Sequence, residues 1–149
     1  MPLTRPPFES GRLEFGYDVR IDTLIYAMTA AGVKGAEQLR DKPAGWISIF
    51  ETVGAHIAKN ASNISIIDAK EEFGMLHMRV IDERLGREIT DIRMWCANES
   101  AVRCMAFGTP GQIRSDHNWI MTLSDAAFDL RNEMPEEQFL SLVYPSPHR

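Results

Sequence analysis

The stretch ISIIDAKEEFGMLHMRV, residues 64–80, constrains the fold more than any other, because its apolar residues do not repeat with a helical period. ISIIDAK is rich in β-branched side chains, and in MLHMRV the residues Leu76, Met78 and Val80 alternate with the others. Between these runs lies EEFG, where Gly74 is free to adopt a positive φ. The sequence therefore predicts a β-hairpin with a four-residue loop.

Helical periodicity precedes the hairpin. Apolar residues follow Asp18 at the i, i+3, i+4 and i+7 spacing, and Gly32 is a stop signal, so one helix is predicted between them. A second helix is predicted to begin near Trp46 and to end at residues 60–63, with its apolar positions on one face. Residues 35–42 are expected to form a turn or a short helix.

The sequence after the hairpin predicts a third long helix over residues 83–101. Arg84 and Glu88 would form an (i, i+4) charge pair on its outer side. Its narrow inward stripe would consist of Leu85, Ile89, Ile92, Cys96 and Ser100. The next predicted elements are a turn with glycine and proline over residues 108–111 and a strand over residues 119–123. Ser124 or Asp125 would cap a short helix over residues 125–131, and a last helix is predicted over residues 136–143.

These elements predict an α+β fold in which helices pack on one face of a small antiparallel sheet. Residues 17–143 are expected to form a single domain, because 149 residues suit one hydrophobic core. Residues 1–16, with several prolines and glycines, are expected to form an extended arm that includes a short strand over residues 13–15, and residues 144–149 form a tail.

The composition excludes several classes of protein. A net charge of -5 argues against coating nucleic acid through a broad basic face, and direct nucleic-acid binding is not expected. Two cysteines, Cys96 and Cys104, are too few for a disulfide framework and suit a reducing cytoplasm. No apolar run approaches the roughly 20 residues that span a membrane, and no secretory signal pattern begins the sequence.

Five segments in order resemble a family of small bacterial and bacteriophage proteins, mostly of unassigned function, that share the motifs GDGW, KEKFGxLR, CExCGxPG and TLCDEH. AGWISIFETV is similar to the helix led by GW, and AKEEFGMLHM is similar to the hairpin motif, with His77 in place of the arginine. ANES resembles a helix end, CMAFGTPGQIR a zinc knuckle, and NWIMTLSDAA the last segment. The resemblance covers residues 44–128.

The family pattern implies a four-ligand zinc ribbon, and here most ligand positions are replaced. Cys104 stands at the first ligand position, Phe107 at the second, Ser124 at the third and Ala127 at the fourth. Structural zinc requires four cysteine or histidine ligands, so this resemblance implies a degenerate, metal-free knuckle in which Phe107 packs where the metal would lie. The sequence thus predicts neither a metal nor a cofactor.

The sequence offers no pattern typical of catalysis. Glycine-rich phosphate loops, GxSxG elbows, HExxH motifs and Rossmann fingerprints do not occur in it. His77, His117 and the two cysteines are not spaced as a metal motif, and Cys96 is expected in the core. Glu71 and Glu72 would point to opposite sides of a strand, so we do not expect them to share a proton. We expect no catalytic residues.

Candidate partner-binding residues fall into four groups. At the hairpin tip, Glu71 and Glu72 have a structural interpretation and a binding interpretation. Trp95, beside Arg93, is expected off the inner stripe of its helix and would suit a protein interface, whereas Trp46 and Trp119 are expected in the core. Two arginines of the knuckle, Arg103 and Arg114, form the third group. The fourth group is the acidic C-terminal residues Asp129, Glu133, Glu136 and Glu137. These acidic residues would either attract a basic groove of a partner or simply be solvated.

Three hypotheses about function follow. The first is a non-enzymatic phage or mobile-element protein that inhibits a host defence complex by protein contact, as anti-CRISPR proteins do, in the cytoplasm of a bacterial host. The second is a nucleic-acid or nucleotide binding module that uses the former ribbon face, and the third is a small enzyme. The sequence leaves open whether the chain forms a homo-oligomer.

Overall fold

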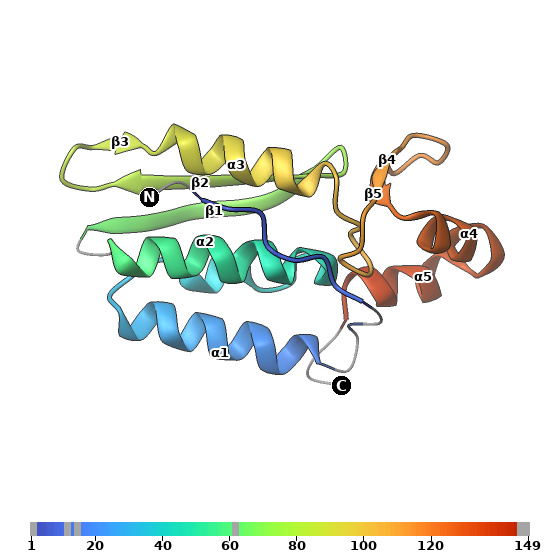
Figure 1. Ribbon diagram of the computed structural model, residues 1–149, viewed down its shortest axis with the longest axis horizontal. Coiled ribbons are helices and arrows are strands. Elements are labelled where there is room, and N and C mark those ends of the chain that lie inside the picture. Colours follow the sequence, from blue (N-terminus) through green and yellow to red (C-terminus); the bar gives the residue numbers. More distant parts are fainter. Residues whose placement is uncertain (1–2, 11–12, 14–15, 61–62, 146–149) are drawn as a thin grey trace.

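The structure is a computed structural model, and it describes residues 3–10, 13, 16–60, 63–145. Figure 1 shows α1 beside α2, then the long hairpin and α3, while the short strands β4 and β5 and helices α4 and α5 gather at one end of the molecule. The elements in chain order are α1 (Tyr17–Ala30), the 3₁₀ turns η1 (Ala36–Leu39) and η2 (Ala44–Trp46), α2 (Ile47–Lys59), β1 (Ile64–Glu72), β2 (Met75–Asp82), β3 (Arg87–Glu88), α3 (Thr90–Ser100), β4 (Gln112–Arg114), β5 (Met121–Leu123), α4 (Asp125–Glu133) and α5 (Glu136–Val143).

The predicted α+β class is confirmed. One antiparallel sheet has the order β1-β2-β3, and β4 pairs with β5 in a second sheet. Leu76, Met78 and Val80 are fully buried on one face of β2, as their alternation predicts, whereas the residues between them are half-buried or exposed. The apolar faces of α1 and α2 and the buried face of this sheet contribute to one core.

The hairpin is confirmed, but its predicted four-residue loop is wrong. Glu71 and Glu72 continue β1 and pair with Leu76 and Met75, so only Phe73 and Gly74 form the loop. Their φ angles of 54° and 83° are the positive pair that a two-residue type I′ turn requires. Such a turn matches the twist of the strands, and this explains why β1 and β2 pair up to the tip.

The helix predicted over residues 83–101 is also wrong in its first part. β2 extends to Asp82, a turn with Gly86 at a φ of 65° follows, and β3 returns to pair with β2. Only then does α3 begin, at Thr90. Leu85, expected to face inward, is 61% exposed, and Arg84 contacts Asp82 rather than Glu88. Gly86 adopts a left-handed conformation, which helices do not contain. The chain therefore turns at this point, and β3 pairs with β2 instead of continuing the helical pattern.

The remaining predicted helices agree with the structure. α1 and α2 lie where their apolar periodicity predicts them, and residues 35–42 contain the short η1. Ser124 caps α4 by accepting a hydrogen bond from Ala127 N, and α5 has the predicted bounds. The strand expected over residues 119–123 is shorter, since β5 begins at Met121. Of the strand predicted over residues 13–15, residues 14–15 lie outside the described part of the chain.

Gly45, in η2 just before α2, explains how this part of the chain meets the loop at Cys104 and Met105. Its N–H donates to Met105 O at 2.8 Å, and a Cβ at this position would lie 1.8 Å from Cys104 O. Only glycine permits so close an approach of two backbones. The next residue, Trp46, is fully buried and packs edge-on against Phe50, with ring centroids 6.3 Å apart.

Candidate functional site

Two loops that are far apart in the sequence meet at the hairpin tip. Phe73 and Gly74 form the tip itself, and the loop between β4 and β5 brings Trp119 beside it. Thr122 Oγ1 donates to Gly74 O at 2.8 Å, and a Cβ on Gly74 would lie 3.0 Å from Thr122 N. The tip therefore packs closely on β5, and glycine is needed for this contact as well as for the turn.

Glu71 joins the two loops through both of its carboxylate oxygens. Oε2 accepts a hydrogen bond from Gly74 N at 2.9 Å, and Oε1 accepts one from Trp119 Nε1 at 2.8 Å. Hydrogen bonds to a carboxylate are stronger than those between neutral groups. The Trp119 ring lies beside Tyr144, with centroids 6.0 Å apart and planes tilted by 30°. Burial and, to a smaller extent, the nearby charge of Glu71 raise the pKa of Tyr144. The indole ring is thus held from two sides.

A groove of about 440 Å³ lies at this junction. The residues that line it are Glu71, Glu72, Phe73, Asn118, Trp119 and Ile120. Phe73 is 68% exposed and Trp119 is 38% exposed, which contradicts the prediction that Trp119 lies in the core. An exposed phenylalanine with a positive φ is unusual, because asparagine or glycine occupies such positions at lower cost. We take this junction, the tip groove, as the candidate functional site.

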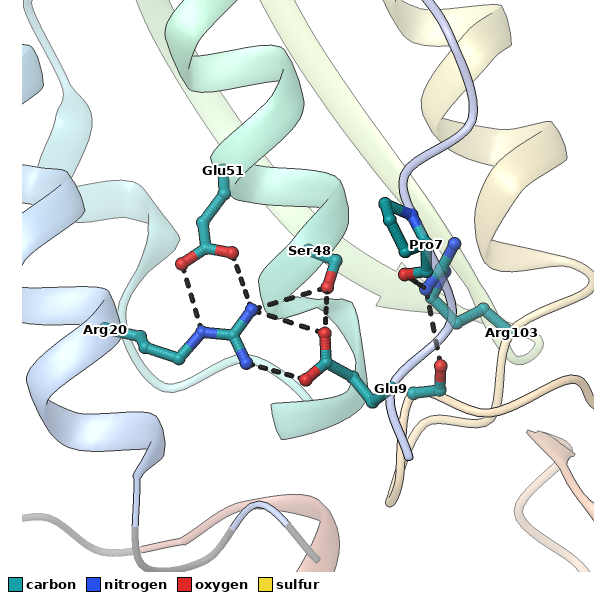
Figure 2. Close-up of polar contacts among 7 residues, drawn as sticks. Pro7, Glu9, Arg20, Ser48, Glu51 and Arg103 are labelled. Carbon is teal, nitrogen blue, oxygen red and sulfur yellow. Dashed lines mark hydrogen bonds and ion pairs between the residues drawn. The ribbon is translucent and has the colours of Figure 1, made fainter. Parts of the chain in front are cut away.

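A second polar cluster, the arm clamp, ties the N-terminal arm to the helices. Figure 2 shows the Arg20 guanidinium of α1 between the carboxylates of Glu9 and Glu51. The Arg20 contacts are 2.7 Å to Glu9 Oε1 and 2.6 Å to Glu51 Oε1. Ser48 Oγ on α2 also donates a hydrogen bond to Glu9. One guanidinium thus connects the arm, α1 and α2.

The pKa values in the arm clamp follow from these contacts. Partial burial raises the pKa of Glu9, but hydrogen bonds from Arg20 and Ser48 and the charge of Arg20 outweigh burial and hold the pKa below its ordinary value. Hydrogen bonds to Glu51 and Glu9 raise the pKa of Arg20. Both groups therefore remain charged at neutral pH, and their charges satisfy each other.

Arg103 completes the arm clamp. Its side chain is fully buried, and its Nη atoms donate to Pro6 O at 2.8 Å, Pro7 O at 3.0 Å and Gly108 O at 3.3 Å. Its guanidinium also lies 4.4 Å from the centroid of the Phe8 ring. Figure 2 shows this side chain directed toward the arm at Pro7. Arg103 therefore stabilises the arm and does not reach the surface as its candidacy for partner binding requires.

The other predicted arginines lie in separate surroundings. Arg114 Nη2 donates to Asp125 Oδ1 at 2.6 Å, and its guanidinium lies 4.7 Å from the Phe128 ring. Arg93 contacts Glu88 at 3.4 Å on the exposed side of α3, whereas Trp95 is half-buried and packs against the hydrophobic core. Arg93, Arg103 and Arg114, all expected to be candidates for partner binding, therefore do not share one set of contacts.

The acidic C-terminal residues keep the exposure that the sequence predicts. Asp129 and Glu133 on α4, and Glu136 and Glu137 on α5, are all exposed. Arg131, between them in sequence, is 4% exposed and donates from Nη2 to Glu136 Oε1 at 3.2 Å. Arg131 thus offsets the charge of Glu136, while Asp129, Glu133 and Glu137 keep their carboxylates on the exposed surface of α4 and α5.

The four positions that the resemblance assigns to zinc ligands have other roles in the structure. Cys104 and Ala127 are fully buried, Phe107 is buried, and Ser124 is the cap of α4. Both cysteines are free, and burial raises the pKa of Cys96, which lies in the core as predicted, to about 12. Within the described ranges, no three or more His, Cys, Asp or Glu side chains are grouped so that they could hold a metal ion.

Comparisons with models of known families, with curated proteins and with solved structures each found no match. The family resemblance, and the knuckle it implies, therefore stay predictions. In the described part of the chain, no helix has the length and apolar character needed to cross a membrane.

Sequence reasoning selected Glu71 and Glu72 but missed the aromatic half of the tip groove. The sequence assigns no binding role to Phe73 and predicts Trp119 in the core, but both side chains line the groove. One signal was present: in a two-residue hairpin loop, phenylalanine precedes glycine where asparagine or aspartate is usual. Nothing local could place Trp119 beside Glu71, because the two residues are 48 positions apart.

Proposed function

We propose that this chain is a non-enzymatic binding protein that acts by protein–protein contact through the tip groove. The observation that carries the proposal is the exposure of Phe73 and Trp119 on a rigid support. Aromatic side chains dominate the energetics of protein interfaces, and those already held in place lose little entropy on binding. Glu71 supports both loops, because its carboxylate accepts a hydrogen bond from each of them.

The departure of Phe73 from local preference gives additional support. A bulky residue in the left-handed region costs stability, and such residues cluster at functional sites. Phe73 does not recover this cost by entering the core, since most of its surface is exposed. Burial of the ring in a complex would offset this cost.

The more specific hypothesis is a phage or mobile-element protein that inhibits a host defence complex in the bacterial cytoplasm. It is based on the family resemblance, on the acidic surface of α4 and α5, and on two free cysteines that suit a reducing compartment. An acidic protein that occupies the nucleic-acid groove of a defence complex would inhibit it without chemistry.

Phage plating tests this hypothesis directly. Bacterial strains, each with one defined defence system, would express the wild-type protein or Phe73→Asn and be challenged with a sensitive phage. We expect wild-type protein to restore plating in at least one strain and Phe73→Asn to fail at equal protein abundance. If plating is restored in no strain across CRISPR and other systems, the defence-inhibitor hypothesis is rejected.

Affinity capture tests the broader proposal. Wild-type protein, Phe73→Asn and Val19→Asn would serve as baits in the same lysate, because Val19 is an equally exposed apolar residue on α1, at 69%. The proposal requires a stoichiometric partner that wild type and Val19→Asn retain and Phe73→Asn loses. A partner that all three baits retain equally would place the contact elsewhere on the protein.

Nucleic-acid binding by the former ribbon face has less support. Of the arginines that would contact phosphates, Arg103 is buried and Arg114 is paired with Asp125. A salt titration with fluorescent DNA distinguishes this alternative, since phosphate binding weakens steeply as salt increases. The enzyme alternative gains no specific observation.

A further inference from the structure

The lining of the tip groove selects a particular kind of ligand. Two carboxylates and two aromatic rings line it, together with the side chains of Asn118 and Ile120. Among its described lining residues there is neither lysine nor arginine. We propose that the groove binds a lysine or arginine side chain of a protein partner, presented between apolar residues. This inference rests on the proposed function and adds the chemistry of the partner.

Glu72 supplies the charge that a basic side chain needs. Its carboxylate contacts Lys70 at 4.0 Å, and both side chains are largely exposed, so this pair contributes little and is easily exchanged. The carboxylate of Glu71 accepts hydrogen bonds from Gly74 and Trp119 and lines the same groove. A guanidinium or ammonium in the groove would therefore meet net negative charge.

The aromatic rings favour the same ligand. The face of tryptophan is the best ring surface for a cation, and phenylalanine also attracts one. Because Glu71 fixes the indole through its N–H, the ring face does not have to be ordered when a ligand arrives. The apolar part of a lysine or arginine stem would lie along Phe73 and Ile120, as long basic side chains do on apolar surfaces.

Charge also decides against nucleic acid as the ligand of this groove. Bases could stack on exposed aromatic rings, but the phosphates that accompany them would approach Glu71 and Glu72. Such like-charge contacts oppose binding, and the net charge of -5 adds to the repulsion. A basic segment of a protein meets no such penalty.

Peptide titration tests the inference with a defined probe. Uniformly ¹⁵N-labelled full-length protein would be titrated with acetyl-Leu-Arg-Leu-amide and with its citrulline counterpart, which has the same shape without the charge. The Trp119 indole signal, assigned by its loss in Trp119→Phe, and the Gly74 amide signal report on the groove. We expect saturable shifts in the millimolar range with the arginine peptide, and binding at least about fivefold weaker with citrulline.

Two charge-neutralising variants sharpen the result. Glu72→Gln should lower the affinity for the arginine peptide by up to about fivefold. Glu37→Gln removes the same charge from η1, which packs near the opposite end of β1, and should leave the affinity unchanged. Equal affinity for arginine and citrulline, equal affinity of the two variants, or an absence of shifts with the arginine peptide would each overturn the inference.

The outcomes separate this inference from the proposed function. If a captured partner depends on Phe73 but both peptides bind equally well, the proposed function is supported and the inference that the groove binds a basic side chain is rejected. If the arginine peptide binds selectively but no partner is captured, the inference about the basic side chain is supported and the proposed function is rejected.

Discussion

The arm clamp and the tip groove use similar residues in opposite ways. In the arm clamp, the charges of Glu9 and Arg20 are satisfied within the protein, and the guanidinium of Arg103 is buried against backbone carbonyls. In the tip groove, Glu71 is satisfied internally, but the two aromatic rings that it helps to place remain exposed. The charged residues of the first region stabilise the fold, whereas the second region combines a rigid support with unburied apolar surface.

This comparison shows why residue type alone is a poor guide to function. Arg103 was a candidate for partner binding because arginine often binds phosphates and protein partners, yet it holds the arm in place. Phe73 is an ordinary hydrophobic residue by type, yet it is largely exposed and has a positive φ, which is unfavourable for phenylalanine. Arg103 and Phe73 thus differ in function because of the groups that each side chain contacts within the fold, not because of its chemical type.

The largest expected effect lies in the arm clamp. Arg103→Met keeps much of the side-chain volume but removes the donors for three carbonyls, which belong to Pro6, Pro7 and Gly108. We expect the free energy of unfolding to fall by about 3 kcal/mol, because the carbonyls of Pro6 and Pro7 would lose a charged donor, whereas Gly108 O keeps the hydrogen bond from Glu9 N. Urea denaturation measures this change. Arg84→Met, at a side chain that is 66% exposed, is the control and should change stability by less than about 0.5 kcal/mol.

The next effect depends on pH. Glu9→Gln should lower the free energy of unfolding by about 1 kcal/mol at pH 7, because the charge opposite Arg20 is lost. The pKa of Glu9 in the folded protein lies below its ordinary value of 4.5, so the stabilisation is complete above that value and is lost as pH falls through the folded pKa. Denaturation curves for both proteins should therefore converge on acidification. A constant difference from pH 7 to strongly acidic pH would contradict the role of charge.

A smaller effect is expected where Glu71 joins the two loops. In Glu71→Gln an NH2 donor replaces one of the two carboxylate oxygens, so in this geometry either Gly74 N or Trp119 Nε1 faces a donor instead of an acceptor. We expect a loss of about 1 kcal/mol and a clear shift of the Trp119 indole signal in NMR spectra. Glu72→Gln, one position along the same strand, should leave that signal in place. Identical spectra for both variants would mean that Glu71 does not position the ring.

The smallest effect on stability has the opposite sign. Phe73→Asn should increase the free energy of unfolding by about 0.5 kcal/mol, since asparagine tolerates a positive φ better than phenylalanine. The same variant should lose partner binding. Thermal denaturation and the capture assay together test the comparison, because a stabilised protein that no longer binds separates function from folding. A clear loss of stability would mean that Phe73 serves the fold instead.

Much of the fold was predictable from local sequence patterns. The alternation through β2 predicted the hairpin, because neighbouring residues of a half-buried strand face opposite sides. The positions of α1, α2, α4 and α5 followed from apolar spacing and from caps such as Ser124. The turn between Asp82 and β3 was not predictable in this way. No local pattern in the sequence marks the end of β2, so the pairing of β3 with it could not be expected.

The candidate site was predictable only in part. Glu71 and Glu72 were selected from the sequence, and the structure places both in the groove. Burial of Arg103 was not foreseen, since its three carbonyl acceptors come from the arm and from the following loop. Trp119 was assigned to the core because its neighbours resemble a strand, but a bend precedes β5 and leaves the ring at the surface.

By itself, the sequence determined the α+β class, the helices on the N- and C-terminal sides of the hairpin and the hairpin at Gly74, because each depends on interactions within a few residues. Only the tertiary structure decided that Arg103 lies under the arm and that Trp119 lies beside Phe73. Those contacts join segments tens of residues apart, and their partners are chosen by the packing of the whole chain rather than by the preference of any one segment.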